Sequence, residues 1–356
     1  MRVRWIALCL LMCISAAASS QAKDPNPLFP IMNDEVLWGY IDRTGKVVIE
    51  PKFDGADYFS EGLAPIKSGF GEATKYGFID KTGKIVIEPR FREVQGFSDG
   101  LAAVSVVEER WGYIDETGKF VIQPRKWWPG DFRNGRARMV VDTDAYSAEL
   151  LCIDKTGNVI VREPVPGEGS QSFGAISPTG KLRIDKKALP CLDFHEGLAA
   201  VPNTDEYARI AYVNEQGKVV IPPKFRCAQD FSEGLAAVQL TDESGFEALG
   251  WGYIDKNAKM VIELECDQAE SFSDGLALVR TYGEQEQVDT VDGDSWARSE
   301  YYKFIDKTGK TAIDLSKYHY AESFRDGLAR VWIVSPELGG APSYIDKTGK
   351  FIWKAE

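Results

Sequence analysis

The chain has few of the side chains on which most enzymes rely. Its 356 residues include only two histidines, His195 and His319, and six cysteines, none of which form a Cys-x-x-Cys pair. Local spacing therefore offers no metal site. The sequence also lacks a Gly-x-Ser-x-Gly elbow, a Walker loop and a His-Glu-x-x-His motif. We predict no catalytic residue, no metal site and no cofactor, and therefore a protein that is not an enzyme.

A basic excess and a long apolar segment are lacking as well. The 54 acidic residues outnumber the 42 basic residues, and the net charge is −12. Since nucleic acids bind positively charged surfaces, we expect no nucleic-acid partner. Beyond the N-terminus, no apolar stretch approaches the roughly 20 residues of a membrane-spanning helix. We therefore expect no transmembrane segment in the mature chain.

Residues 1–22 have the pattern of a secretory signal peptide. A short basic start precedes an apolar run of about ten residues, at 5–14, and a stretch rich in small residues follows it. We expect the protein to be periplasmic or extracellular after cleavage. Lipid anchoring at Cys13 is the less favoured alternative, because the preceding Met12 is not the small residue that a lipobox needs.

The sequence is rich in one repeated pattern, which predicts a strand, a tight turn and a second strand. The first copy, at 38–49, reads Trp-Gly-Tyr-Ile-Asp-Arg-Thr-Gly-Lys-Val-Val-Ile. The aspartate can accept hydrogen bonds from amides of its own turn, and the glycine can adopt a positive φ. At 256–259 the turn lacks a glycine, and we expect Asn257 to take that conformation. The turn residues recur at intervals of 23 to 51 residues: Gly45, Gly83, Gly118, Gly157, Gly180, Gly217, Ala258, Gly309 and Gly349.

A second motif, Phe-Ser-Glu-Gly-Leu-Ala at 59–64, follows the first at a steady offset. Glu-Gly, Asp-Gly and Asn-Gly are turn dipeptides, and the apolar residues after them predict a short strand. Prolines such as Pro51 end the preceding strand, because proline cannot donate to a ladder. Later copies of this motif begin at Phe97, Phe132, Phe194, Phe231, Phe272 and Phe324.

Repeats of this period indicate an array of small β-units. Each unit offers at least three antiparallel strands, and because a lone hairpin is marginal in water, the units must stack on one another. We predict an all-β fold of about eight tandem hairpin or meander units. A propeller-like ring and a curved β-array both satisfy the pattern.

The spacing also suggests how the chain is divided. A short N-terminal segment (23–36) leads into a first half of repeat units (37–161). The interval between the turns at Gly157 and Gly180 is too short for a full unit, so 162–190 should be a degenerate unit with an irregular connection. The second half of the units follows at 191–356.

These motifs resemble those of the WG-repeat family, also called KWG repeats. The resemblance rests on Trp-Gly-Tyr-Ile-Asp, Thr-Gly-Lys-x-Val-Ile, Pro-x-Phe and Phe-Ser-Glu-Gly-Leu-Ala, and it covers roughly residues 26–354. The family is widespread in bacterial surface and secreted proteins. The resemblance implies a binding or scaffolding role and gives no catalytic residues to transfer.

Three tryptophans are candidate binding residues: Trp127, Trp128 and Trp296. Adjacent tryptophans provide a large apolar surface with polar handles. They either fill the core, as the other repeat aromatics do, or form an exposed platform for sugars or peptides. His195 replaces a serine of the repeat turn, and we expect it to lie on the surface.

Four cysteines remain after signal removal: Cys152, Cys191, Cys227 and Cys266. An even number in an exported chain permits disulfides. Cys191 and Cys227 occupy similar links in neighbouring units, so a Cys191–Cys227 bridge is the favoured pairing. Buried free thiols are the alternative.

These observations favour an exported, non-enzymatic scaffold for protein–protein interaction in the bacterial envelope, with a protein partner of unknown identity. A module that binds cell-wall glycan through exposed aromatics is the alternative. Net acidity, the predicted export and the repeats fit both hypotheses.

Overall fold

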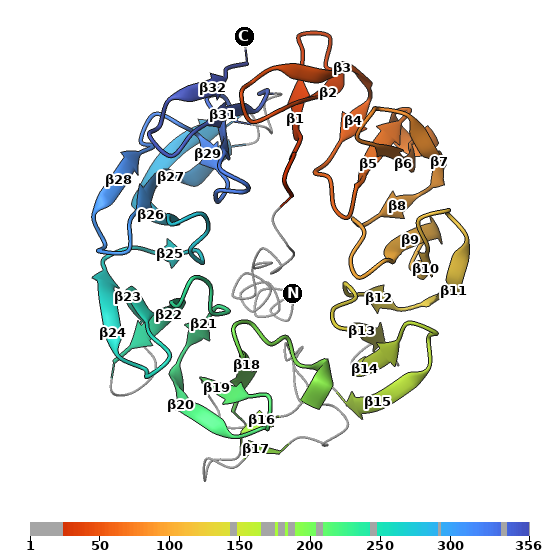
Figure 1. Cartoon of the computed structure of the whole chain (residues 1–356). Helices are drawn as coiled ribbons and strands as arrows, with labels where there is room; N and C mark the ends of the chain where they lie inside the picture. The colour runs from red at the N-terminus through yellow and green to blue at the C-terminus, as the bar shows by residue number, and fades with distance from the viewer. Residues whose placement is uncertain are drawn as a thin grey trace.

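The protein is a ring of small antiparallel β-sheets around a central axis (Figure 1). The computed structural model describes residues 24–142, 148–164, 175–176, 182–183, 189–203, 209–242, 248–290, 293–335 and 340–355. The signal peptide expected at 1–22, including Cys13, lies outside these residues. So do the turn at Gly180 and the side chain of Trp296.

Eight of the sheets are the blades of a β-propeller, and the strands of each blade follow one another from the axis to the rim (Figure 1). Blade 1 contains β1 (Phe29–Met32), β2 (Trp38–Ile41) and β3 (Val47–Phe53). Blade 2 contains β4 (Gly55–Ala56), β5 (Leu63–Ser68), the 3-10 turn η1 (Gly71–Ala73), β6 (Lys75–Asp80) and β7 (Ile85–Phe91). Blade 3 contains β8 (Glu93–Val94), β9 (Ala102–Val107), β10 (Arg110–Ile114) and β11 (Phe120–Lys126). Blade 4 contains β12 (Trp128–Pro129), β13 (Arg136–Asp142), β14 (Ala148–Asp154) and β15 (Val159–Pro164).

The other four blades repeat this arrangement. Blade 5 contains β18 (Leu198–Pro202), β19 (Ile210–Asn214) and β20 (Val219–Phe225). Blade 6 contains β21 (Cys227–Ala228), β22 (Ala236–Thr241), β23 (Ala248–Ile254) and β24 (Met260–Leu264). Blade 7 contains β25 (Gln268–Ala269), β26 (Ala277–Thr290), β27 (Gly293–Ile305) and β28 (Thr311–Asp314). Blade 8 contains β29 (Tyr320–Ala321), β30 (Ala329–Trp332), β31 (Ser343–Ile345) and β32 (Phe351–Trp353).

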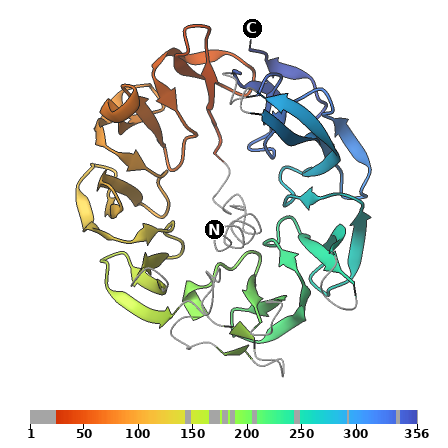
Figure 2. The same cartoon turned by 180° about the vertical axis from the view of Figure 1, so that it is seen from behind.

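This architecture confirms the predicted all-β repeat fold with about eight units, and it selects the ring over the curved array. Seen from behind, the first and last blades lie side by side and close the circle (Figure 2). A hydrophobic cluster fills each of the eight interfaces between neighbouring blades. The repeated aromatic and branched residues therefore pack between blades, where a single unit cannot bury them alone.

The glycine of Trp-Gly-Tyr is required by a close backbone approach. On the third strand of a blade the ladder shifts register opposite this glycine, as between Trp38 and Tyr40. A Cβ at Gly39 would lie 2.4 Å from the carbonyl oxygen of Ile49. Real Cβ atoms do not come this close to backbone, so a side chain at Gly39 would force the neighbouring strand to shift. Blade 5 has the same register shift with Ala211 at the equivalent position, so there the two strands accommodate a Cβ.

Where a blade has a tyrosine at the third position of Trp-Gly-Tyr, this residue links the blade to the next one. Tyr113, for example, packs edge-on against Phe132 of blade 4 and donates its hydroxyl to the carbonyl oxygen of Gly130 at 2.7 Å. The same bond, to the residue 17 positions further on, is made by Tyr40, Tyr212 and Tyr253. The buried hydroxyl is thereby satisfied.

Residues 162–190 interrupt the ring's regularity without opening it. β16 (Ala175–Ile176) and β17 (Leu182–Arg183) form a separate two-stranded sheet, which comes between blades 4 and 5 in chain order and lies beside blade 5 (Figure 1). In blade 5, the 3-10 turn η2 (Leu189–Cys191) occupies the chain position of the innermost strand. Side chains of β14, η2 and β18 share one apolar cluster, so the two halves of the chain are joined by a common core.

A disulfide joins Cys152 to Cys191, whereas the sequence favoured a Cys191–Cys227 pairing. Cys152 stands at the tyrosine position of blade 4, opposite Val161, as Tyr113 stands opposite Ile122 in blade 3. A side chain at this position points to the innermost segment of the following blade. In blade 5 that segment contains Cys191, so the bridge replaces the tyrosine hydrogen bond.

Contacts between blades 8 and 1 close the ring. Tyr344 donates its hydroxyl to the carbonyl oxygen of Pro30 at 2.8 Å, and Arg43 Nε donates to the carbonyl oxygen of Asp326 at 2.8 Å. Tyr58 reaches from blade 2 to the first and last blades, where the guanidinium groups of Arg325 and Arg330 lie 4.6 and 4.8 Å from its ring centre. Among the described residues, no strand of one blade pairs with a strand of another. The ring is therefore closed by side-chain contacts.

Candidate functional site

The Phe-Ser-Glu-Gly turns surround one end of the central axis. Both central residues of each turn have positive φ, as at Glu61 (52°) and Gly62 (87°). These are the dihedrals of the tight hairpin turn that suits a twisted β-ribbon. The turns connect the innermost segment to the next strand in blades 2 to 8, and they point into the ring from these blades.

Most polar residues of these turns hold neighbouring blades together. Ser60 Oγ donates to the carbonyl oxygen of Phe97 at 2.6 Å. The Glu61 carboxylate accepts the backbone amides of Asp99 and Gly100 in the next turn, each at 2.8 Å. The same serine bond recurs at Ser98, Ser232 and Ser273, and the same carboxylate bond at Asp99, Glu196, Glu233 and Asp274.

A lysine from the Asp-Lys-Thr-Gly turn completes this belt. Lys256 Nζ lies 3.1 Å from the Glu196 carboxylate and donates to the Glu196 carbonyl oxygen at 2.8 Å. Equivalent contacts are made by Lys155 with Asp99, Lys307 with Glu233, and Lys347 with the Asp274 carbonyl oxygen. The recurring serines, acids and lysines are therefore part of the ring's own framework.

Inside the belt lies a cavity of about 1180 Å³, which we call the mouth. Phe59, Phe97 and Phe272 contribute to its wall, together with the serines and glycines of the turns. Its charged lining residues are mostly acidic: Asp24, Asp57, Glu61, Asp131, Glu233, Glu270, Asp274, Glu322 and Asp326, against Lys81, Arg133 and Arg325. A cleft lined by one sign of charge concentrates counter-ions and charged partners.

Three residues at the inner wall of the mouth carry acceptors that the ring does not use. The Asp57 carboxylate accepts only the amide of its neighbour Tyr58, at 2.7 Å, within the described chain. Gln95 Oε1 is buried and has no hydrogen-bond partner there. The Asp131 carboxylate faces the cavity, but the surrounding protein desolvates it and raises its pKa, while nearby Arg133 opposes this effect.

Elsewhere around the axis, similar groups are paired. Glu322 binds Arg330 at 2.5 Å, and Arg138 forms an ion pair with Asp193. His195 Nε2 lies 3.3 Å from Asp230 Oδ2 and 3.1 Å from Arg133 Nη1. Burial raises the pKa of Asp230, and the neighbouring His195 opposes it.

His195 corrects an expectation from the sequence, because its side chain is only 9% exposed rather than lying on the surface. It stands at the serine position of blade 5, where Arg133 stands in blade 4. The contacts of His195 with Arg133 and Asp230 therefore take the place of the serine–carbonyl hydrogen bond that other blades form at this position.

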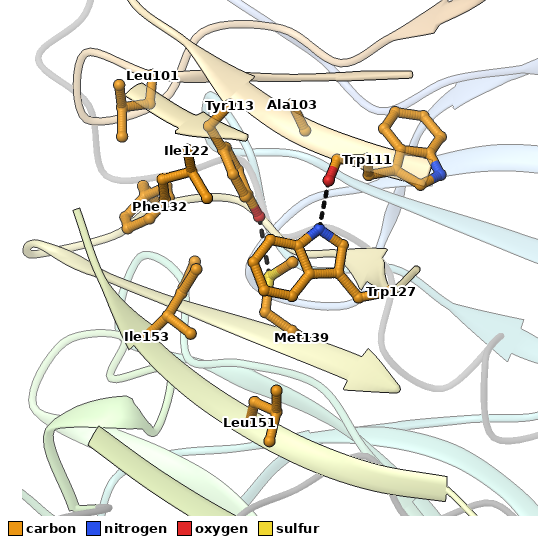
Figure 3. Close-up of a cluster of buried hydrophobic side chains, with 11 residues drawn as sticks. Leu101, Ala103, Trp111, Tyr113, Ile122, Trp127, Phe132, Met139, Leu151 and Ile153 are labelled. Atoms are coloured by element: carbon orange, nitrogen blue, oxygen red, sulfur yellow. Dashed lines mark hydrogen bonds between the residues drawn. The ribbon is translucent and has the colours of Figure 1, made fainter. Parts of the chain in front are cut away.

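The structure separates the two adjacent tryptophans. Trp127 is 4% exposed and lies in the core between blades 3 and 4, where its Nε1 donates to the carbonyl oxygen of Trp111 at 2.6 Å (Figure 3). Trp128, on the innermost strand β12, is 49% exposed. The two rings do not form one platform, because successive side chains of a strand point to opposite faces.

Two further properties concern the described residues alone. No group of three histidine, cysteine, aspartate or glutamate side chains is arranged there to hold a metal ion. Nor does any helix in the described ranges have the length and apolar character needed to cross a membrane.

The sequence missed Asp57, Gln95 and Asp131 because they precede the repeated Phe-Ser-Glu-Gly letters and differ from unit to unit. This variation between units was the sequence signal that could have identified the three residues. Positions fixed in every unit serve the ring, whereas a site that exists once must lie where the units differ.

Comparisons with known proteins agree with this architecture. The fold defines the chain as a β-propeller. The family described as WG containing repeat matches residues 38–69, 76–106, 111–142, 211–242, 251–284 and 304–331, more than half of the chain. The protein belongs to this WG-repeat family. A comparison with curated proteins gives no match.

Solved structures with a similar fold include the β-propeller domain of the Trilobed protease from Pyrococcus furiosus. It is 13% identical, with a TM-score of 0.51, and the alignment covers 86% of this chain and 99% of that one. A eukaryotic initiation factor is 11% identical over 93% of this chain and 88% of that one, with a TM-score of 0.46. Apo AztD from Citrobacter koseri is 11% identical over 92% and 94%, with a TM-score of 0.44. At these identities the likeness concerns the fold alone.

Proposed function

We propose that this protein is an exported, non-enzymatic scaffold for protein–protein interaction and that its mouth binds the partner. The single observation that carries the proposal is the mouth itself, an acidic concavity whose inner wall has acceptors that the ring does not use. Ligand-binding sites in proteins are typically concave places where a few polar groups converge.

The non-enzymatic role is supported by the hydrogen bonds of the recurrent polar residues, which lie within the turns and between blades. Asp42 binds the amides of its own turn, while Ser60 and Glu61 bind the next blade. Groups engaged in such fixed hydrogen bonds support structure, and their repetition in unit after unit is what a scaffold requires.

Export is supported by the buried Cys152–Cys191 disulfide, since disulfides persist in oxidising compartments. It also agrees with the signal peptide predicted at 1–22. Both observations support a site of action in the bacterial envelope or outside the cell, with lipid anchoring at Cys13 as the alternative to a free protein.

The test is co-precipitation from an envelope extract with residues 23–356 as bait, since these contain all described blades. The variant Asp57→Asn/Asp131→Asn removes two charges from the mouth. The control Glu50→Gln/Glu88→Gln removes two exposed charges from the rim strands β3 and β7. We expect one partner that the wild type and control retain and the mouth variant loses. A partner retained by all three proteins would contradict the proposal.

Glycan binding remains the second candidate because of the exposed ring of Trp128. Aromatic rings stack on sugars only when they are accessible, so Trp127 no longer supports this candidate. If the protein binds cell-wall polysaccharide through Trp128, then Trp128→Ala should abolish retention on that polysaccharide and the mouth variant should not.

A further inference from the structure

The unused acceptors form one arc on three consecutive blades. Asp57 of blade 2 and Gln95 of blade 3 each lie two residues before the phenylalanine of the turn, and Asp131 of blade 4 lies one residue before it. All three residues line the mouth. Each presents oxygen atoms, and within the described chain none of the three makes an ion pair closer than 4 Å.

Gln95 gives the clearest evidence that this arc can accept a hydrogen bond from a ligand. Its Oε1 is buried without a hydrogen bond in the described structure. Gln229 occupies the same position in blade 6 and is fully used: its Nε2 donates to the carbonyl oxygen of Ala269 at 3.0 Å, and its Oε1 accepts Ser271 Oγ at 3.0 Å. Since a buried polar atom without a partner is costly, the Gln95 site favours a ligand that donates N–H groups.

The charges of the mouth specify the kind of donor. A cation satisfies Asp57 and Asp131 as well as Gln95, because ammonium and guanidinium groups carry several N–H donors and no acceptor. The other acids of similar position already have cations or donors, as Glu322 has Arg330 and Asp230 has His195. In the arc of blades 2 to 4, the Asp57 carboxylate accepts one backbone amide and Asp131 has Arg133 nearby, but neither carboxylate forms an ion pair within 4 Å in the described chain.

Resting on the proposed function, we propose that the arc of Asp57, Gln95 and Asp131 binds a lysine or arginine side chain of an extended basic segment of the partner. The mouth, at about 1180 Å³, has room for several residues of such a segment. Its remaining acids attract the neighbouring basic side chains of the segment and raise its rate of association.

Binding of fluorescein-labelled octalysine, measured by anisotropy at about 150 mM salt, tests the proposal. We expect Asp57→Asn/Asp131→Asn to weaken binding by about tenfold or more, because each charged hydrogen bond accounts for roughly that factor. Glu50→Gln/Glu88→Gln, which has the same net charge, should change it less than twofold. An octapeptide of glycine and serine should not bind.

Gln95 provides an independent gain-of-function variant. Gln95→Glu adds a third carboxylate to the arc and should tighten octalysine binding several-fold, whereas Gln95→Ala should weaken it. Equal melting temperatures of the variants would show that folding is intact. Equal loss in the mouth and rim variants, no binding of octalysine, or no tightening by Gln95→Glu would each overturn the inference.

The two proposals fail in different ways. If octalysine binds at the mouth but no envelope protein is retained there, the scaffold function is wrong and the cation site stands. If an envelope protein is lost by the mouth variant but octalysine does not distinguish the variants, the scaffold stands and the basic segment is wrong.

Discussion

At the scale of single residues, the Asp-x-Thr-Gly turn shows how much local chemistry the sequence reveals. Asp42 Oδ1 accepts the Thr44 amide at 2.8 Å, the Thr44 hydroxyl at 2.6 Å and the Lys46 amide at 3.1 Å, as the motif predicted. In the one turn without glycine, Ala258 has the positive φ of 63°, so the expectation for Asn257 was wrong. The turn therefore imposes a positive φ on its fourth residue, whether that residue is glycine or alanine.

Ala258→Gly should raise the free energy of unfolding by about 0.5–1 kcal/mol, because the left-handed conformation strains a residue with a Cβ. Gly309→Ala is the opposite change at the equivalent position. There φ is 83° and a Cβ would lie 2.8 Å from Ile262 Cγ2, so we expect a loss of about 1–3 kcal/mol. Urea unfolding measures both, and a destabilised Ala258→Gly would contradict the assignment of this turn.

The same turns make stability depend on pH. The hydroxyl of Thr156, with backbone amides, lowers the pKa of Asp154 to about 2. The folded pKa lies below that of an unfolded aspartate, near 3.9, so the stabilisation is present above pH 4 and is lost as the pH falls to 2. The thermal stability of the wild type should therefore decline through this range.

Asp154→Asn isolates this effect, since Asn214 already forms the same turn in blade 5. The wild type should be more stable than the variant near pH 6, and the difference should shrink towards zero at pH 2. A difference that is constant over this range would show that the carboxylate charge has no part in the turn.

At the scale of the blade, a repeat motif that looks uniform contains distinct structural roles. The glycine after tryptophan fits a bulge on the neighbouring strand, and the tyrosine links one blade to the next. Cys152 could have been paired correctly by aligning it with those tyrosines. A comparison of the cysteines with one another does not reveal that Cys152 is equivalent to those tyrosines.

Gly112→Ala should destabilise the protein by about 1–3 kcal/mol, because the new Cβ would lie 2.6 Å from the carbonyl oxygen of Ile122. Gly96→Ala is the matched control: its Cβ would have nothing nearer than Ser60 Cβ at 3.6 Å. Thermal unfolding of the two variants should differ clearly. If both are neutral, the close approach at the bulge is not what selects glycine.

Reducing the disulfide should lower the stability of the interface between blades 4 and 5. Closing 39 residues accounts for about 2–4 kcal/mol of unfolding free energy. Peptide mapping under non-reducing conditions should recover Cys152 bound to Cys191, and Cys191→Ala should lose the stabilisation. Cys266→Ala is a control without this effect. A Cys191–Cys227 peptide would contradict the structure.

At the scale of the whole molecule, the sequence predicted the all-β repeats and their number but left ring and open array as alternatives. Closure depends on single contacts between residues at opposite ends of the chain, such as Tyr344 with Pro30, which no repeat pattern contains. The mouth was unpredictable for the same reason. It arises only when eight units face one axis, and its distinctive residues vary from blade to blade.

The central claim is that the repeated residues stabilise the ring, while residues of the mouth that vary between blades bind the partner. Hydrogen–deuterium exchange of residues 23–356 with and without octalysine tests it most directly. We predict protection of the turns at 57–62, 95–100 and 131–135, with no change in the hairpin loops at 69–74 and 107–110 at the other ends of their blades. Protection of those loops, or equal protection around the rim, would contradict the claim.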